Sequence, residues 1–225
     1  MKILLIIVIL VVVLVAGVVV WLGMPKGPSL GEVAHLQTPQ ILDMEAQKVL
    51  QVRAQGNPNA VGKRAFGLLM KTYFGLKGVP KGGPSFQPPR ARWPVGEDIP
   101  MEEWVGLYAM PVPGNVAEVA GGDSEGGLQV ELVTWEYGEV AQILHVGRYD
   151  EEVPDTETLK EFIRSQGYEI TGLHEEEYLK GPGFIFAGNP DNYLTLIRYQ
   201  VKKIGSAGSS EADGPGGGDE GLSAK

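Results

Sequence analysis

The stretch with the clearest chemical potential is Glu175-Glu176-Glu177-Tyr178-Leu179, which sets three carboxylates beside a phenol. In an extended strand, residues i and i+2 share a face. Glu176 and Tyr178 would therefore point one way, and Glu175 and Glu177 the other. Charge runs of this kind are typical of an exposed acidic strand edge. The alternative is that one carboxylate enters a ligand cleft while its neighbours meet solvent.

A carboxylate in an aromatic-lined cleft suits a lipophilic cation, because charge pairing is poorly screened there. Ring faces of tyrosine or tryptophan add cation–π attraction of roughly 0.5 to 2 kcal/mol each. Besides Tyr178, the candidate ligand-binding rings are Tyr149, Tyr199 and Trp104. The alternative for each ring is ordinary core packing.

Other site chemistries have little support in the sequence. The three histidines, His35, His145 and His174, are far apart and predict no metal site. We expect His145 to be a structural residue on a strand and His174 to be exposed. Cysteine is absent, which excludes thiolate catalysis and cysteine-based metal ligation. No cofactor is predicted.

The charge balance bears on the class of partner. Lys plus Arg number 19 and Asp plus Glu 28, for a net charge of −9, and the cations form no cluster. Neutralising nucleic-acid phosphates requires clustered Lys and Arg. We therefore expect no nucleic-acid partner.

The two ends differ in composition from the middle of the chain. Residues 3–22 are an uncharged apolar run, long enough as a helix to cross a bilayer. The prediction is a single-pass membrane anchor at 1–24 and a linker at 25–37, with a cleaved signal peptide as the alternative. The flanking charges slightly favour an extracytoplasmic domain. Residues 204–225, rich in Gly, Ser and acids, predict a disordered tail.

Between the ends, residues 38–112 and 128–203 show the same order of patterns. Each half has two strand-like segments, a Gly-containing turn, an apolar helical pattern, and two further strand-like segments. The helical patterns rest on Phe66, Leu69, Met70 and Tyr73 in the first half and on Leu159, Phe162 and Ile163 in the second. The strands after the helices are expected at 78–82 and 104–112, and at 167–172 and 193–201. The prediction is an α+β domain of two strand-strand-helix-strand-strand repeats, related by a pseudo-twofold axis, with a ligand cleft between them.

Several motifs in the second half occur in the order found in a known family. They are His145-Val146-Gly147-Arg148-Tyr149, the helix 156–165, Gly167-Tyr168 and Glu175 to Leu179. In this order they resemble the GyrI-like small-molecule-binding domain, the effector-binding domain of AraC-type and MerR-type multidrug regulators. The resemblance covers about 38–203. It implies that the acid two residues before the tyrosine, Glu176, contacts the ligand together with Tyr178.

The resemblance leaves three functions open. The first is a membrane-anchored module that binds a small, cationic or amphipathic ligand. Some members of the family hydrolyse strained cyclopropanoid compounds, so the second is a hydrolase in which Glu176 and Tyr178 assist the attack of water. The third is a protein-interaction module that the anchor localises.

Overall fold

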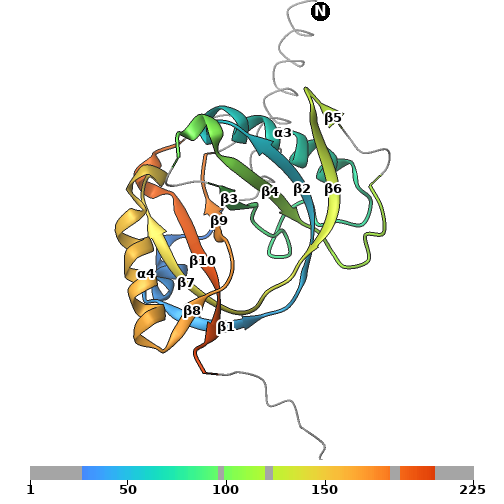
Figure 1. Ribbon diagram of the computed structural model, residues 1–225. Helices are drawn as coiled ribbons and strands as arrows, with labels where there is room; N and C mark the ends of the chain where they lie inside the picture. The colour runs from blue at the N-terminus through green and yellow to red at the C-terminus, as the bar shows by residue number, and fades with distance from the viewer. Residues whose placement is uncertain (1–26, 96–98, 120–123, 183–187, 206–225) are drawn as a thin grey trace, which may run out of the picture.

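The computed structural model of the protein describes residues 27–95, 99–119, 124–182 and 188–205 (Figure 1). The predicted anchor at 3–22 lies outside these ranges, as does nearly all of the predicted tail. No helix in the described ranges combines the length and the apolarity needed to cross a membrane.

One antiparallel sheet of ten strands forms the body of the fold. Neighbouring strands follow the order β1-β7-β10-β9-β3-β4-β2-β6-β5, and β8 pairs separately with β10. The strands are β1 (Gln40–Met44), β2 (Gln47–Gln55), β3 (Arg90–Val95), β4 (Val105–Pro111), β5 (Ser124–Glu125), β6 (Leu128–Trp135), β7 (Gly138–Val146), β8 (Tyr168–Ile170), β9 (His174–Lys180) and β10 (Leu194–Lys203). The predicted α+β class is confirmed.

Two long helices accompany the sheet, α3 (Pro58–Gly75) and α4 (Val153–Ser165). Helix α3 begins at Pro58, and the side chain of Asn57 caps it by accepting a hydrogen bond from a backbone N–H. Helix α4 stops before Gly167, whose φ of 77° is the left-handed conformation that ends many helices. The short helical segments are α2 (Leu30–Val33), η1 (Ala34–Gln37), η2 (Met101–Glu103), η3 (Tyr149–Glu151) and η4 (Pro190–Asn192).

Both long helices pack on the same face of the sheet. Directly opposed residues of paired strands share a face, and one such row runs from β7 to β6. Its members are Ile143, Ile197, Glu176, Ala91, Tyr108, Val52 and Val130. Leu159 and Ile163 of α4 pack with the β7 end of this face, and Leu68 and Leu69 of α3 with the β6 end. Glu176 is the charged member of an otherwise hydrophobic row, midway between the helices.

The opposite face is closed by the curvature of the sheet, which Figure 1 shows. Val49 and Ala109, from the β2–β4 side of the strand order, share one core cluster with Val140, from the β7 side. Trp135 and Tyr137, near the β6–β7 connection, belong to the same cluster. The sheet therefore has two buried faces, one under the helices and one enclosed by its own curvature.

The elements recur in the order β1-β2-α3-β3-β4 and β6-β7-α4-β9-β10, with β5 and β8 as short additions. Two details of the prediction were wrong. Residues 78–82 form no strand, and the third strand of the first half is β3, which was not predicted. The halves also share one continuous sheet, because β1 pairs with β7 and β6 pairs with β2.

Candidate functional site

Glu176 lies on the helix-covered face of β9 and is only 6% exposed. Its carboxylate accepts a hydrogen bond from the indole nitrogen of Trp93 on the neighbouring strand β3. It also accepts a hydrogen bond from the hydroxyl of Tyr178, two residues along the same strand. The predicted pair of Glu176 and Tyr178 therefore lies on one face, and that face points between the helices.

Aromatic rings surround this carboxylate. Tyr178 meets Tyr149 edge-on at 5.5 Å and Phe66 of α3 at 5.6 Å between ring centroids. Trp93 meets Tyr108 edge-on at 5.7 Å. Contacts of this geometry stabilise rings beyond simple burial. The Glu176 side chain thus lies in an apolar shell with two hydrogen-bond donors aimed at it.

The phenols near Glu176 hold their protons firmly. Burial, and then the charge of Glu176, raise the pKa of Tyr178 well above its usual value and raise that of Tyr149 as well. The same two causes raise the pKa of Tyr108 to about 12. These hydroxyls therefore remain hydrogen-bond donors over the whole neutral range.

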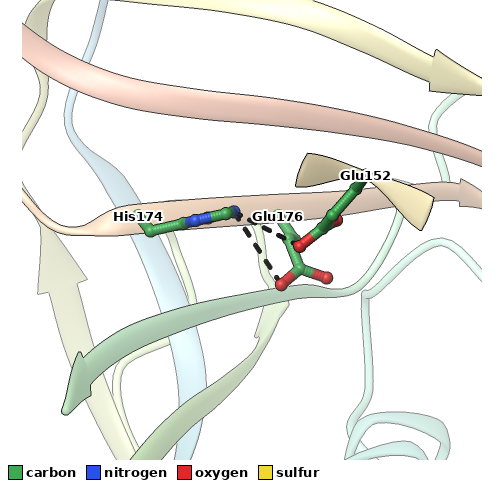
Figure 2. Close-up of side chains that lie close together, drawn as sticks. All are labelled: Glu152, His174 and Glu176. Carbon is green, nitrogen blue, oxygen red and sulfur yellow. Dashed lines mark ion pairs between the residues drawn. The ribbon is translucent and has the colours of Figure 1, made fainter. Parts of the chain in front are cut away.

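His174 and Glu152 complete the polar part of the site (Figure 2). Nε2 of His174 lies 3.9 Å from Glu176 and 4.0 Å from Glu152. His174 precedes Glu176 by two residues on β9 and so shares its face. The prediction of an exposed His174 was wrong, since its side chain is only 10% exposed. Glu152 follows η3, the turn that also carries Tyr149, so one turn delivers both residues to the site.

Glu175 and Glu177 point to the other face of β9, as alternation predicts, but they do not meet solvent. Glu175 is 2% and Glu177 7% exposed. They are buried because arginines from β3 and β10 lie opposite them under the curved sheet. The expectation that they lie outside was wrong.

Three arginines hold these two acids. Arg198 contacts Glu175 at 2.6 Å and Glu177 at 3.0 Å. Arg92 pairs with Glu175 at 2.7 Å, and Arg90 with Glu177 at 3.2 Å. This group of five residues, termed here the arginine–glutamate ladder, is extended by stacking of Arg92 on the rings of Trp135 and Tyr137.

The two sides of β9 therefore differ in electrostatics. The arginine–glutamate ladder contains three cations and two anions. On the helix-covered side, no Lys or Arg in the described ranges forms an ion pair with Glu176, and its basic neighbour is His174. Burying a carboxylate without a cationic partner is costly, and hydrogen bonds such as those from Trp93 and Tyr178 offset only part of that cost.

The predicted ligand-binding residues fall into two groups. Tyr178 and Tyr149 belong to the shell around Glu176. Trp104 and Tyr199 lie one layer away, where Trp104 packs on Trp93 at 5.7 Å and Tyr199 on His174 at 5.3 Å. The hydroxyl of Tyr199 is 3.2 Å from Nδ1 of the same histidine.

Sequence reasoning missed Trp93, Tyr108 and Glu152. The segment Arg90-Ala91-Arg92-Trp93 does alternate, and that signal could have identified β3. The site also requires a residue without a side chain at Gly106. A Cβ there would lie 2.7 Å from the ring of Tyr108 and 3.0 Å from that of Trp93, so a side chain would displace the rings.

His145 has the structural role predicted for it. One ring nitrogen lies 2.8 Å from a carboxylate oxygen of Asp155, and the other 2.8 Å from the carbonyl oxygen of Arg148. With both nitrogens occupied and the side chain buried, His145 ties β7 to the start of α4.

No protein-family model matches the sequence, and no curated protein does either. Solved structures with a similar fold do exist. An uncharacterized conserved protein from Listeria innocua is 22% identical with a TM-score of 0.62, and the match covers 79% of this chain and 94% of that one. A hydrolase from Listeria innocua is 20% identical with a TM-score of 0.59, over 79% and 93% of the two chains.

A third similar structure is the C-terminal domain of EcmrR, which is 14% identical with a TM-score of 0.53. The match covers 74% of this chain and 98% of that domain. EcmrR has also been solved as a complex with DNA. At such identities the likeness shows a shared fold alone.

Proposed function

We propose that this domain binds a small cationic or amphipathic molecule on the helix-covered face of β9, with Glu176 as its counter-charge. The observation that carries the proposal is the contrast along β9. Glu175 and Glu177 are neutralised by three arginines, whereas Glu176 sits among aromatic rings without one. A lipophilic cation would supply the missing charge and contact the surrounding aromatic rings.

The aromatic shell would contribute to both affinity and selectivity. Tyr178, Tyr149 and Trp93 offer ring faces and edges around the carboxylate, and cation–π attraction adds about 0.5 to 2 kcal/mol per well-placed ring. Trp104 and Tyr199 would support Trp93 and His174 from the second layer. The proposal also includes a pseudo-twofold relation between the halves. Counted outward from the central β9–β3 pair, β10, β7 and β1 on one side correspond to β4, β2 and β6 on the other.

We expect the protein to bind a cationic probe more tightly than a neutral probe of the same shape. Methyltriphenylphosphonium and triphenylphosphine oxide have almost the same size and differ in charge. We expect the cation to bind the full-length protein, solubilised in a non-ionic detergent, at least about tenfold more tightly, since one additional charge pair contributes about 1.4 kcal/mol or more. Isothermal titration calorimetry measures both affinities. Equal affinities, or binding of neither probe, would contradict the proposal.

A hydrolase is the second candidate. Two carboxylates, a histidine and the hydroxyls of the half-buried Tyr149 and Tyr178 would together position a water molecule beside Glu176. A spirocyclopropyl dienone would report this activity, because addition of water to the ring forms a phenol and changes the absorbance. Turnover that disappears in Glu176→Gln would favour the hydrolase over simple binding.

Membrane attachment through residues 3–22 remains part of the proposed function, and it rests on the apolar run alone. The proposal includes an extracytoplasmic domain and a disordered tail at 204–225. The membrane fraction should retain the protein after alkaline carbonate washing. A mature N-terminus near Met24 would instead identify a cleaved signal peptide.

A further inference from the structure

Glu152, His174 and Glu176 bring one imidazole nitrogen and two carboxylate oxygens within 4.8 Å of one another (Figure 2). Nε2 of His174 is 4.0 Å from Oε1 of Glu152 and 3.9 Å from Oε1 of Glu176. These separations are too long for direct hydrogen bonds. A point equidistant from the three atoms lies about 2.5 Å or less from each, within a few tenths of an ångström of the zinc–ligand distances of about 2.0 to 2.2 Å.

From this geometry we propose that Glu152, His174 and Glu176 bind a divalent transition-metal ion. One nitrogen and two oxygen ligands suit Zn²⁺ and its first-row neighbours, with water in the remaining positions. Two carboxylates also match the charge of a divalent ion. The metal would therefore neutralise acids that lie against an apolar shell.

A hydrogen-bond partner of His174 favours the ring orientation that metal binding requires. The hydroxyl of Tyr199 lies 3.2 Å from Nδ1, so a proton on Nδ1 can be donated to that oxygen. Nε2 then carries the lone pair, and it faces both carboxylates. A hydrogen bond to the far nitrogen is the usual way in which proteins orient a metal-binding histidine.

The remaining histidines are poor alternatives. Both ring nitrogens of His145 are engaged, one by Asp155 and one by the carbonyl oxygen of Arg148. His35 is exposed on η1. Since the chain has no cysteine, a transition metal bound tightly at a single site should involve His174.

This inference goes beyond the proposed function and does not depend on it, although both use Glu176. A metal ion at this position would occupy the carboxylate that an organic cation needs. Zn²⁺ and methyltriphenylphosphonium should therefore compete. If only the phosphonium ion binds, the metal site is refuted and the proposed function stands. If only Zn²⁺ binds, the reverse holds.

The first test is a titration of the full-length protein with Zn²⁺, followed through the imidazole ¹⁵N resonances of the three histidines. We expect one equivalent of Zn²⁺ to shift Nε2 of His174 and to leave His145 unchanged. This readout uses the wild-type chain and so does not depend on the folding of a variant. A response of His35 alone, or of no histidine, would refute the site.

The second test compares variants by calorimetry with Zn²⁺. Glu152→Gln keeps the side-chain shape and should weaken binding by more than the roughly 10- to 100-fold typical of losing an outer-shell partner. Tyr199→Phe should weaken Zn²⁺ binding by roughly 10- to 100-fold, because it removes such an outer-shell partner. His35→Ala is the matched control and should bind as the wild type does. Unchanged affinity in Glu152→Gln would overturn the assignment of that ligand.

Discussion

Glu176→Gln should weaken binding of methyltriphenylphosphonium by about 2 to 5 kcal/mol, which is roughly 30-fold or more. The substitution keeps the planar side chain and an oxygen that can accept from Trp93 and Tyr178. It removes the charge that a cation would face in a poorly screened site. Binding of triphenylphosphine oxide should change little. Calorimetric titration of both probes against both proteins measures the effect.

The control for this experiment must be an acid outside the site. Glu177, which the sequence placed on the opposite face in solvent, is unsuitable because it is buried and paired with Arg198 and Arg90. Glu169 on β8 is exposed and serves better. Glu169→Gln should leave both affinities unchanged. Equal losses in Glu176→Gln and Glu169→Gln would mean that the effect comes from overall charge rather than from the site.

Arg198→Met is expected to produce the largest loss of stability, about 3 to 5 kcal/mol in the free energy of unfolding. Arg198 is 4% exposed and contacts both buried acids of the arginine–glutamate ladder. Burial on its own would lower the pKa of Arg198, but Glu177 and Glu175 hold it above its ordinary value. Removing the guanidinium would leave Glu175 and Glu177 buried with less compensation. Chemical denaturation measures the change.

Arg148→Met provides the comparison, because Arg148 forms ion pairs that are largely exposed, with Asp150 and Glu151. Solvent screening makes such pairs weak, so stability should hardly change. A small effect of Arg198→Met, similar to that of Arg148→Met, would show that the ladder adds little to stability. Partial recovery in a variant that also carries Glu175→Gln would identify the uncompensated carboxylate as the cause of the loss.

The arginine–glutamate ladder also bears on the site across β9. A one-residue slip of a strand reverses the direction of every side chain. Glu175 and Glu177 are pinned to arginines on both neighbouring strands, so the ladder opposes such a slip. Glu176 is thereby held on the helix-covered face. The charges on one face of the strand thus contribute to the position of the acid on the other.

Alternation in the sequence was enough to predict that Glu176 and Tyr178 share a face, opposite Glu175 and Glu177. It was not enough to predict what that opposite face meets. Burial there depends on the curvature of the sheet and on Arg90, Arg92 and Arg198, which are distant in sequence. The acidic run looked like a solvated edge because its arginine partners came from other strands.

Trp93 and Glu152 could not be predicted either, because their place in the site depends on contacts between distant parts of the chain. Trp93 lies on β3, which carries a register irregularity between Arg92 and Val95 and was not predicted as a strand. Glu152 reaches the site through the turn before α4, and no local pattern in the sequence links it to His174 on β9. The proposed metal site is visible only when these two elements are brought together in the fold.

The most direct test of the central claim is to locate a bound cation in a crystal. Methyltriphenylarsonium has nearly the shape of the phosphonium probe, and anomalous scattering marks its arsenic atom. We expect that atom on the helix-covered face of β9 beside Glu176, within about 6 Å of the centre of at least one tyrosine or tryptophan ring. An arsenic peak elsewhere on the protein, with none beside Glu176, would contradict the assignment of this carboxylate as the ligand-binding group.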